Sequence, residues 1–336
     1  MSQRDMRKWI EEVKTNPRRR ALPVLSFPGA GLAGITILDL VHHGELQALC
    51  MKTIADRYPT LAAVSNMDLS IEAEAFGCTV VFNEHEVPTV TGNRIETADQ
   101  AASLVIPPVG AGRTGECIKA ISLAVREIDD RPVLAGVIGP FSLAGRLMGL
   151  TEFIYRVMDD PDMVHLLLDK AATFLTSYIL ALKAAGANGI MMAEPAAGLL
   201  SPSWNAEFST PYVKRIVDAV QDDTFVVAYH NCGNTVPLAE SLVANGCRMY
   251  HFGNAIRMKE IIGRIPADRM VLGNIDPASQ FARGTPESVA EAVSNLLDEM
   301  AGHDNFVLSS GCDIPPQTPI ENIDAFFRTL EESNPL

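Results

Sequence analysis

Eight short apolar runs recur along the whole chain, and amphipathic stretches separate them. The runs are Leu22–Phe27, Leu61–Ser65, Pro132–Ile138, Gly189–Ala193, Phe225–Tyr229, Arg248–Phe252, Met270–Gly273 and Phe306–Ser309. Each is nearly continuous in apolar residues, as is typical of parallel strands that are buried on both faces. Eight β/α units within 336 residues favour a TIM (β/α)8 barrel in the α/β class.

A doubly wound sheet is the alternative fold, but it usually has fewer strands. Gly29, Gly31 and Gly34 have the G-x-G-x-x-G spacing of a dinucleotide-binding turn. However, no acidic residue ends the second run about 20 residues later, as that motif requires. We therefore interpret these glycines as part of a flexible loop.

The sequence predicts one domain spanning residues 1–336, with residues 1–20 as an N-terminal helical extension. No low-complexity segment or Gly/Ser linker divides the chain. The second unit is unusually long, and its segments Cys78–Asn83 and Val87–Thr91 suggest a β-hairpin inserted after the second barrel strand. An insertion there would lie on the active-site face and would form part of a lid.

The charge balance limits the partners of the chain. Lys plus Arg number 27 and Asp plus Glu number 41, which gives a net charge of −14. This balance argues against nucleic acids and anionic membranes, because both are polyanions. Arg18, Arg19 and Arg20 are interpreted as a solvated turn. No apolar run reaches the length that a membrane-spanning helix needs, and the N-terminus is polar. We therefore expect a cytoplasmic protein without membrane contact.

Polar residues follow most of the predicted strands at their carboxyl ends, where TIM barrels place catalytic side chains. We expect these residues around the barrel mouth: Asp68, Glu194, His230, His251, Asn274, Asp276 and Cys312.

The most specific motif is His230-x-Cys232 together with Cys312. Residues two apart at a strand end point to the same side, and the ends of two barrel strands can converge over the mouth. One imidazole and two thiolates suit Zn²⁺, and three protein ligands leave an open position. A zinc ion with two thiolate ligands is better suited to activate a substrate thiol than to activate a water molecule. The sequence therefore predicts alkyl transfer to sulfur.

Several segments together identify a family. YHNCGN and SSGCDIPPQTP resemble the zinc motifs of methylcobamide:coenzyme M methyltransferases, and MDLSIEAEAFG, GVIGPFSLAGRLMG and AEPAAGLLSP resemble the same group. That group belongs to the uroporphyrinogen decarboxylase superfamily of TIM barrels. The resemblance implies zinc on His230, Cys232 and Cys312, and methylcobalamin carried by a partner corrinoid protein. Glu194 and His251 are candidates for a fourth ligand.

The acceptor stays open between a small thiol, coenzyme M or another, and tetrahydrofolate. For the thiol, Glu194 or Asp68 would orient the acceptor, and His251 and Arg146 would bind it, although Arg146 also fits a plain surface residue. For tetrahydrofolate, which needs no zinc, Asn274 and Asp276 would bind the pterin, although Asn-x-Asp-Pro is also a common turn.

The sequence gives less support to two further functions. Uroporphyrinogen decarboxylases hold their polycarboxylate substrate with arginines just after the first strand, and Ser26–Gly31 contains none. A corrinoid-protein docking module without turnover is the non-enzymatic alternative, and the polar residues gathered on one rim argue against it.

Overall fold

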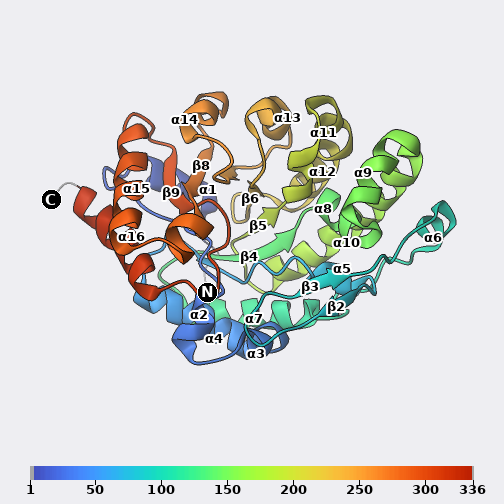
Figure 1. The fold of residues 1–336 in the computed structure, drawn as a ribbon, viewed down its shortest axis with the longest axis horizontal. Helices are drawn as coiled ribbons and strands as arrows, with labels where there is room; N and C mark the ends of the chain where they lie inside the picture. The colour runs from blue at the N-terminus through green and yellow to red at the C-terminus, as the bar shows by residue number, and fades with distance from the viewer. Residues whose placement is uncertain (1–3, 335–336) are drawn as a thin grey trace.

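The central feature is a curled sheet of seven parallel strands (Figure 1). The computed structural model describes residues 4–334. The strands pair in the order β1-β4-β5-β6-β7-β8-β9. Their bounds are Ala63–Val64 (β1), Val133–Ile138 (β4), Gly189–Ala193 (β5), Val226–Asn231 (β6), Met249–Phe252 (β7), Met270–Ile275 (β8) and Phe306–Ser310 (β9). The predicted TIM-barrel class is confirmed.

The prediction of eight regular strands is wrong for the first apolar run. Leu22–Phe27 forms no strand, and only Ala21 bridges in parallel to Leu308 of β9. The segment still fills the eighth wall position, because Leu22 N donates to Leu308 O at 2.9 Å and Leu61 N donates to Ala21 O at 2.8 Å. Pro23 has no N–H and interrupts the ladder.

The barrel interior is filled by alternate residues of each strand. Its core includes Met191 and Ala193 of β5, Val226 and Ala228 of β6, Met249 of β7, Met270 and Leu272 of β8, and Val307 of β9. Side chains two residues apart in a strand share a face. The same inward row therefore continues through His230, His251, Asn274 and Ser309 at the carboxyl ends.

Helices cover the outside of the sheet (Figure 1). The α-helices are Met6–Thr15 (α1), Pro28–Ala33 (α2), Ile37–His42 (α3), Gly44–Arg57 (α4), Ile71–Ala75 (α5), Ala98–Ser103 (α6), Thr114–Glu127 (α7), Pro140–Met148 (α8), Leu150–Asp159 (α9), Pro161–Ala184 (α10), Pro202–Phe208 (α11), Thr210–Val220 (α12), Ala239–Ala244 (α13), Met258–Ile261 (α14), Pro286–Glu299 (α15) and Ile320–Ser333 (α16). Short 3-10 or π turns span Pro195–Leu199 (η1), Val236–Leu238 (η2), Ile262–Arg264 (η3) and Pro277–Ala282 (η4). Asp160 and Thr285 cap α10 and α15 with their side chains, and Pro follows each cap.

The glycines of the first βα connection lie in and after a short helix rather than in a flexible loop. α2 contains Gly29 and Gly31, and Gly34 ends it in the left-handed region at φ 70°. A Cβ on Gly29 would lie 2.7 Å from Ile54 Cδ1 of α4. Gly29 is therefore explained by close helix–helix packing.

The long second unit contains two short antiparallel strands, β2 (Thr79–Val81) and β3 (Thr89–Thr91). Each has three residues, fewer than the predicted segments. Thr79 pairs with Thr91 and Val81 pairs with Thr89. The pair forms a separate sheet beside the barrel (Figure 1).

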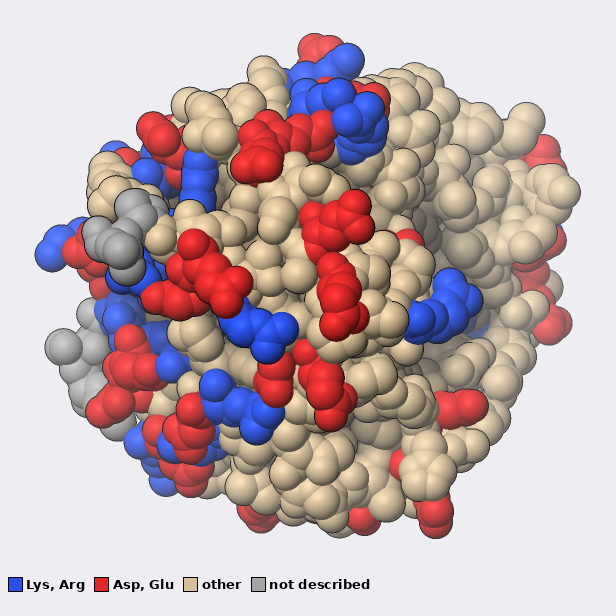
Figure 2. All heavy atoms as spheres, turned by 60° about the vertical axis from the view of Figure 1, so that its left-hand side comes forward, with Lys and Arg blue, Asp and Glu red and all other residues tan. Residues whose placement is uncertain are grey.

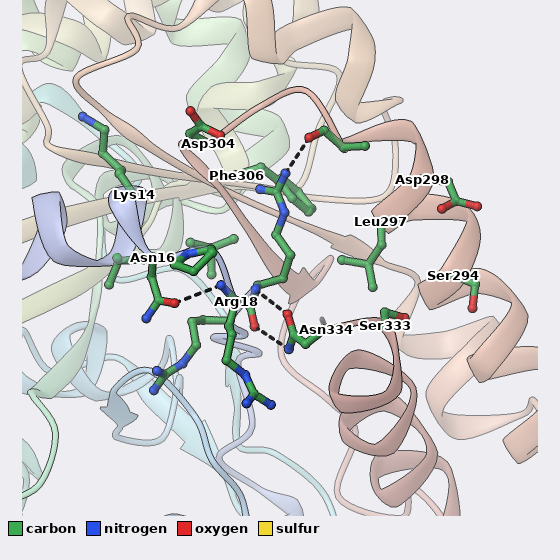
Figure 3. A pocket seen from close by; sticks show the side chains of 16 residues that line it. Lys14, Asn16, Arg18, Ser294, Leu297, Asp298, Asp304, Phe306, Ser333 and Asn334 are labelled. Atoms are coloured by element: carbon green, nitrogen blue, oxygen red, sulfur yellow. Dashed lines mark hydrogen bonds between the residues drawn. The ribbon is translucent and has the colours of Figure 1, made fainter. Parts of the chain in front are cut away.

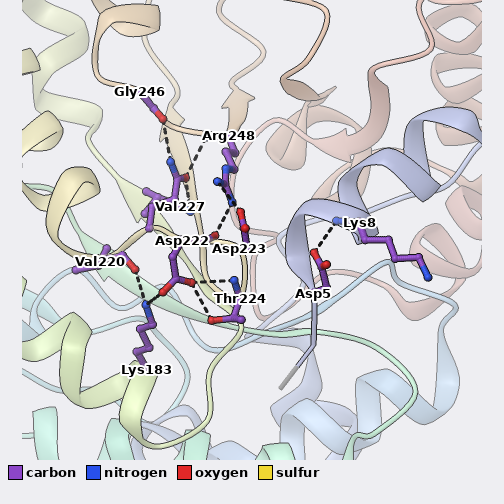
Figure 4. A network of polar contacts seen from close by, with 11 residues as sticks. Asp5, Lys8, Lys183, Val220, Asp222, Asp223, Thr224, Val227, Gly246 and Arg248 are labelled. Carbon is purple, nitrogen blue, oxygen red and sulfur yellow. Dashed lines mark hydrogen bonds and ion pairs between the residues drawn. The ribbon is translucent and has the colours of Figure 1, made fainter. Parts of the chain in front are cut away.

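Helix α1 closes the amino end of the barrel. Its apolar face buries Met6, Trp9 and Ile10 in the barrel-interior core. A polar network anchors its start, since Met6 N donates to Asp223 O at 2.7 Å. In the same network Lys183 donates to Asp222 and Arg248 reaches the 222–223 turn (Figure 4). Burial alone would raise the pKa of Asp222, but bonds from Lys183 and Thr224 lower it to about 2.

A hollow of about 600 Å³ lies between the end of α1, α15 and the end of α16 (Figure 3). The predicted solvated turn of three arginines lines it. Arg19 is half-buried and donates to the carbonyls of Met300, Ala301 and His303 just after α15, at 2.7–3.1 Å. Arg18 pairs with Glu331 of α16. These arginines hold helix ends together, as residues at the amino face of a TIM barrel commonly do.

Helix α10 is long and apolar enough to cross a membrane, contrary to the expectation that apolar stretches are too short. Within its most apolar 18-residue window, 56% of the residues are buried inside the protein. A core helix passes the same test of length and composition. On the face shown in Figure 2, basic side chains lie among acidic ones rather than in one broad patch.

Candidate metal centre

Three metal-capable side chains converge at the carboxyl end of the barrel, as predicted. His230 is the fifth residue of β6, Cys232 follows that strand, and Cys312 lies two residues after β9. The potential ligand atoms of the three residues all lie within 4.8 Å of one another. Cys312 Sγ is 3.6 Å from His230 Nε2. Sheet closure brings together residues that are 80 positions apart in the chain.

One distance within this group has the value expected for two ligands of a zinc ion. With Zn–S distances of about 2.3 Å and Zn–N distances of about 2.0–2.1 Å, tetrahedral sulfur and nitrogen ligands lie about 3.6 Å apart. The distance from Cys312 Sγ to His230 Nε2 has this value. Three N/S ligands leave a fourth position for an exchangeable group.

A hydrogen-bond relay behind the group orients the imidazole of His230. His251, its register partner on β7, is fully buried. Its Nε2 lies 2.8 Å from the carbonyl oxygen of Ser310 and 2.8 Å from Ser309 Oγ. Because a carbonyl only accepts, His251 Nε2 carries the proton.

The relay fixes the tautomer of His230. Burial lowers the pKa of His251 well below its usual range, so this ring is neutral and its Nδ1 accepts. The donor is His230 Nδ1, at 2.6 Å. The lone pair of His230 Nε2 is then directed at the thiols. Metal-binding histidines are commonly held in this way by a second hydrogen bond.

The two thiols differ in acidity. The Cys312 thiol donates to the sulfur of Cys232, and this contact is the main cause that lowers the pKa of Cys232. The pKa of Cys312 is raised, because its thiol donates to Cys232 and because it is buried. One thiolate therefore forms readily at this position, as a metal ligand requires.

A small cavity of about 70 Å³ opens beside the three side chains. Asp313 lines it and was not among the predicted site residues, although it directly follows Cys312. Both of its carboxylate oxygens accept from Ser26 Oγ, at 3.1 and 2.9 Å. Burial raises the pKa of Asp313 to about 7, against the opposing effect of these bonds. The contact needs the tertiary fold, since Ser26 is far away in sequence.

Glu194 is at the carboxyl end of β5, but its side chain faces α8. Its carboxylate oxygens accept from Phe141 N and Ser142 N, each at 2.7 Å. Burial raises the pKa of Glu194 to about 7. The structure places Glu194 at the N-terminus of α8 rather than in the group of potential metal ligands.

Asp68 is buried in an ion-pair cluster. It pairs with Arg113, which also donates to Glu74 Oε2 at 2.6 Å. Ser70 N and Ser70 Oγ donate to the other carboxylate oxygen of Asp68. The side chain thus ties the loop after β1 to the start of α7.

The remaining predicted site residues lie apart from the cavity wall. Asn274 Nδ2 donates to the carbonyls of Gly253 and Ile256, at 2.9 and 2.8 Å. Asp276 caps η4 by accepting from Ala278 N and Ser279 N. Arg146 is exposed on α8. These placements match the turn and surface interpretations that the sequence also allows.

The other four cysteines are buried. Burial raises the pKa of Cys50, Cys78, Cys117 and Cys247. Such positions suit cysteine as a small apolar side chain in the core.

Comparisons with known proteins point to one family. The chain is 29% identical over 260 residues to the methylcobamide:CoM methyltransferase MtbA of Methanosarcina mazei, covering 76% of this chain and 75% of that protein. It is 26% identical over 314 residues to a uroporphyrinogen decarboxylase of Alcanivorax borkumensis, covering 88% of this chain and 86% of that protein. A solved methyltransferase from Methanosarcina mazei superposes with a TM-score of 0.87 at 22% identity, over 98% of each chain. The profile of the uroporphyrinogen decarboxylase (URO-D) family matches residues 12–333. The chain therefore belongs to the URO-D family.

Proposed function

We propose that this protein is a corrinoid-dependent methyltransferase. It would move a methyl group from methylcobalamin on a partner corrinoid protein to a small thiol held by zinc. The observation that carries the proposal is the convergence of His230, Cys232 and Cys312 within 4.8 Å. The similarity to a methylcobamide:CoM methyltransferase supports the same reaction class.

Each residue of the site would have its own role in this reaction. His230 Nε2 and the sulfurs of Cys232 and Cys312 would hold the ion, and His251 would keep His230 in the binding tautomer. Zinc, when bound, lowers the pKa of a coordinated thiol, so that a thiolate forms at neutral pH. The adjacent cavity would admit the acceptor. The corrinoid protein would approach the carboxyl end of the barrel from outside, in the cytoplasm.

Tetrahydrofolate has less support as the acceptor. The pterin would need hydrogen-bonding groups, and both candidates are already bonded to backbone groups. The Asn274 amide donates to the carbonyls of Gly253 and Ile256, and Asp276 accepts from the first N–H groups of η4. Decarboxylation also has less support, although family relatives catalyse it. The segment Ser26–Gly31 contains no arginine to hold a polycarboxylate.

The test combines metal content with methyl transfer. Freshly purified protein should carry about one zinc per chain, as a three-ligand site would hold. It should consume free methylcobalamin when a thiol is supplied, seen as a loss of the methylcobalamin spectrum. Cys312→Ser should lose most of the zinc and the transfer, whereas Cys78→Ser, a buried cysteine outside the group, should keep both. A wild-type protein that binds no zinc would disprove thiol activation, and one that binds zinc but leaves methylcobalamin intact would favour a docking module.

A further inference from the structure

The cavity beside the candidate metal group has apolar walls. Besides the three potential ligands and Asp313, its lining consists of Val24, Met67, Leu69, Ala193 and Pro195. These residues come from the first wall segment, the loop after β1 and the end of β5. The volume is about 70 Å³, which suits a few methylene groups rather than a large acceptor.

Asp313 places a carboxyl group in this cavity, and this group has no positive charge with which to bind an anion. Its carboxylate is engaged with the Ser26 hydroxyl. Two cysteines in the same wall would be thiolates when they ligate a metal. The two thiolate charges then cancel the charge of a divalent ion, so the site has no net positive charge to attract a further anion.

Within residues 4–334, the cavity lining contains no Lys or Arg. Arg146, the cation expected to hold an acceptor anion, lies exposed on α8. Arg113 is nearly buried, but its guanidinium is paired with Asp68 and Glu74. A buried anion without a paired cation is strongly disfavoured.

We propose that the methyl acceptor is a short-chain uncharged thiol whose apolar tail occupies this cavity. The inference rests on the proposed function and names its substrate class. A thiol with an anionic tail, such as the sulfonate of coenzyme M, is a poor match for the site. Each methylene group of a neutral tail that enters the cavity improves binding roughly fourfold.

The reaction is balanced without a further reactant. The acceptor sulfur forms a bond to the methyl carbon and the cobalt–carbon bond breaks. The bonding pair stays on cobalt, which leaves as cob(I)alamin, and the thiol proton goes to solvent. The product is an uncharged methyl thioether.

The experiment compares three thiols with the same two-carbon chain: ethanethiol, 2-mercaptoethanol and coenzyme M. The zinc-loaded protein receives free methylcobalamin and equal concentrations of each thiolate. We expect kcat/KM for ethanethiol to exceed that for coenzyme M at least tenfold, with tighter binding of ethanethiol by calorimetry. Equal or better use of coenzyme M would overturn the inference while leaving the proposed function intact. Transfer to none of the thiols would overturn both.

A variant with an added cation tests the physical reason. Leu69→Arg places a guanidinium in the half-buried wall, and we expect it to improve coenzyme M relative to ethanethiol at least tenfold. Leu199→Arg adds the same charge at a position that is 62% exposed and outside the lining, and it should keep the wild-type ratio. An unchanged ratio in a folded, zinc-containing Leu69→Arg protein would contradict the charge argument. If that variant does not fold, the wild-type thiol series decides alone.

Discussion

At the scale of single residues, the orientation of one imidazole depends on a buried neighbour. His251 bonds to His230 Nδ1 on one side and to the end of β9 on the other. The relay continues from Ser309 Oγ to the carbonyl of Leu22, at 2.7 Å. Three wall segments of the barrel thus fix which nitrogen of His230 faces the thiols. His251 acts behind the candidate metal position rather than as a ligand.

We expect His251→Phe to weaken zinc binding about 10- to 100-fold, because His230 loses the acceptor that fixes its tautomer. Competition with a chromophoric chelator measures the affinity. His251→Gln keeps an acceptor and should recover part of the loss. Nitrogen-15 spectra of the imidazoles should show a proton on His230 Nδ1 in the wild type. Unchanged zinc affinity in a folded His251→Phe protein would show that the relay has no role in binding.

At the scale of secondary-structure elements, α8 begins against the carboxylate of Glu194. Two backbone N–H groups at the start of α8 donate to it. Such an anion compensates the unpaired N–H groups and the positive end of the helix dipole. The carboxylate is fully buried, and its pKa is raised to about 7 by that burial. This position explains a buried glutamate at a strand end without assigning it to catalysis.

We expect Glu194→Gln to reduce the free energy of unfolding by about 1–3 kcal/mol at pH 5, since one backbone N–H loses its acceptor. The folded-state pKa of Glu194, about 7, lies above the ordinary value of 4.5 for a glutamate. The proton that the folded state holds therefore stabilises it fully below about pH 4.5, and this stabilisation is lost as the pH rises through about 7. Because glutamine does not titrate, the destabilisation should shrink by pH 8.

Urea unfolding at pH 5 and pH 8 measures this difference, with the exposed Glu240→Gln as the matched control. A Glu194→Gln protein of wild-type stability at both pH values that has lost methyl transfer would instead restore the catalytic role predicted from the sequence.

At the scale of the whole molecule, the two ends of the barrel have different roles: contacts at the amino end stabilise the fold, and the carboxyl end carries the candidate site. Its amino end is closed by α1 and by polar networks that tie helix ends to loops. Its carboxyl end carries the candidate metal group and the small cavity. TIM barrels use their two ends in this way, because loops after the strands vary without disturbing the packed interior. Changes at one end are therefore expected to leave the other intact.

We expect Trp9→Ala to lower the free energy of unfolding by about 3–5 kcal/mol, because it removes a large side chain from the barrel-interior core. Trp9 is 8% exposed and packs with Met6 and Ile10. The exposed Glu12→Ala on the same helix should cost far less. Circular dichroism during urea unfolding measures the loss, and metal analysis should still find wild-type zinc. A loss of zinc from folded Trp9→Ala protein would contradict the separation of the two ends.

The sequence by itself determined the features that depend on local pattern. Seven of the eight apolar runs overlap sheet strands, because short, continuous apolar runs suit strands that are buried on both faces of a parallel sheet. Local capping signals mark the starts of α10 and α15, where Asp160 and Thr285 are each followed by Pro. The His230-x-Cys232 motif can be recognised in the sequence because its two residues are close together. Cys312 was assigned to the same site because it follows another strand at its carboxyl end and because the family resemblance includes it.

Tertiary structure alone decided the features that depend on contacts between distant segments. The irregular first run keeps its place in the barrel wall through backbone bonds to Leu308 of β9 and to Leu61, just before β1. The orientation of Glu194 toward α8, of His251 toward His230 and of Asp313 toward Ser26 follows from packing between strands far apart in the chain. A strand-end position fixes where a backbone lies, but which partner a side chain bonds to is set by its neighbours in the folded barrel, and no sequence spacing encodes those neighbours.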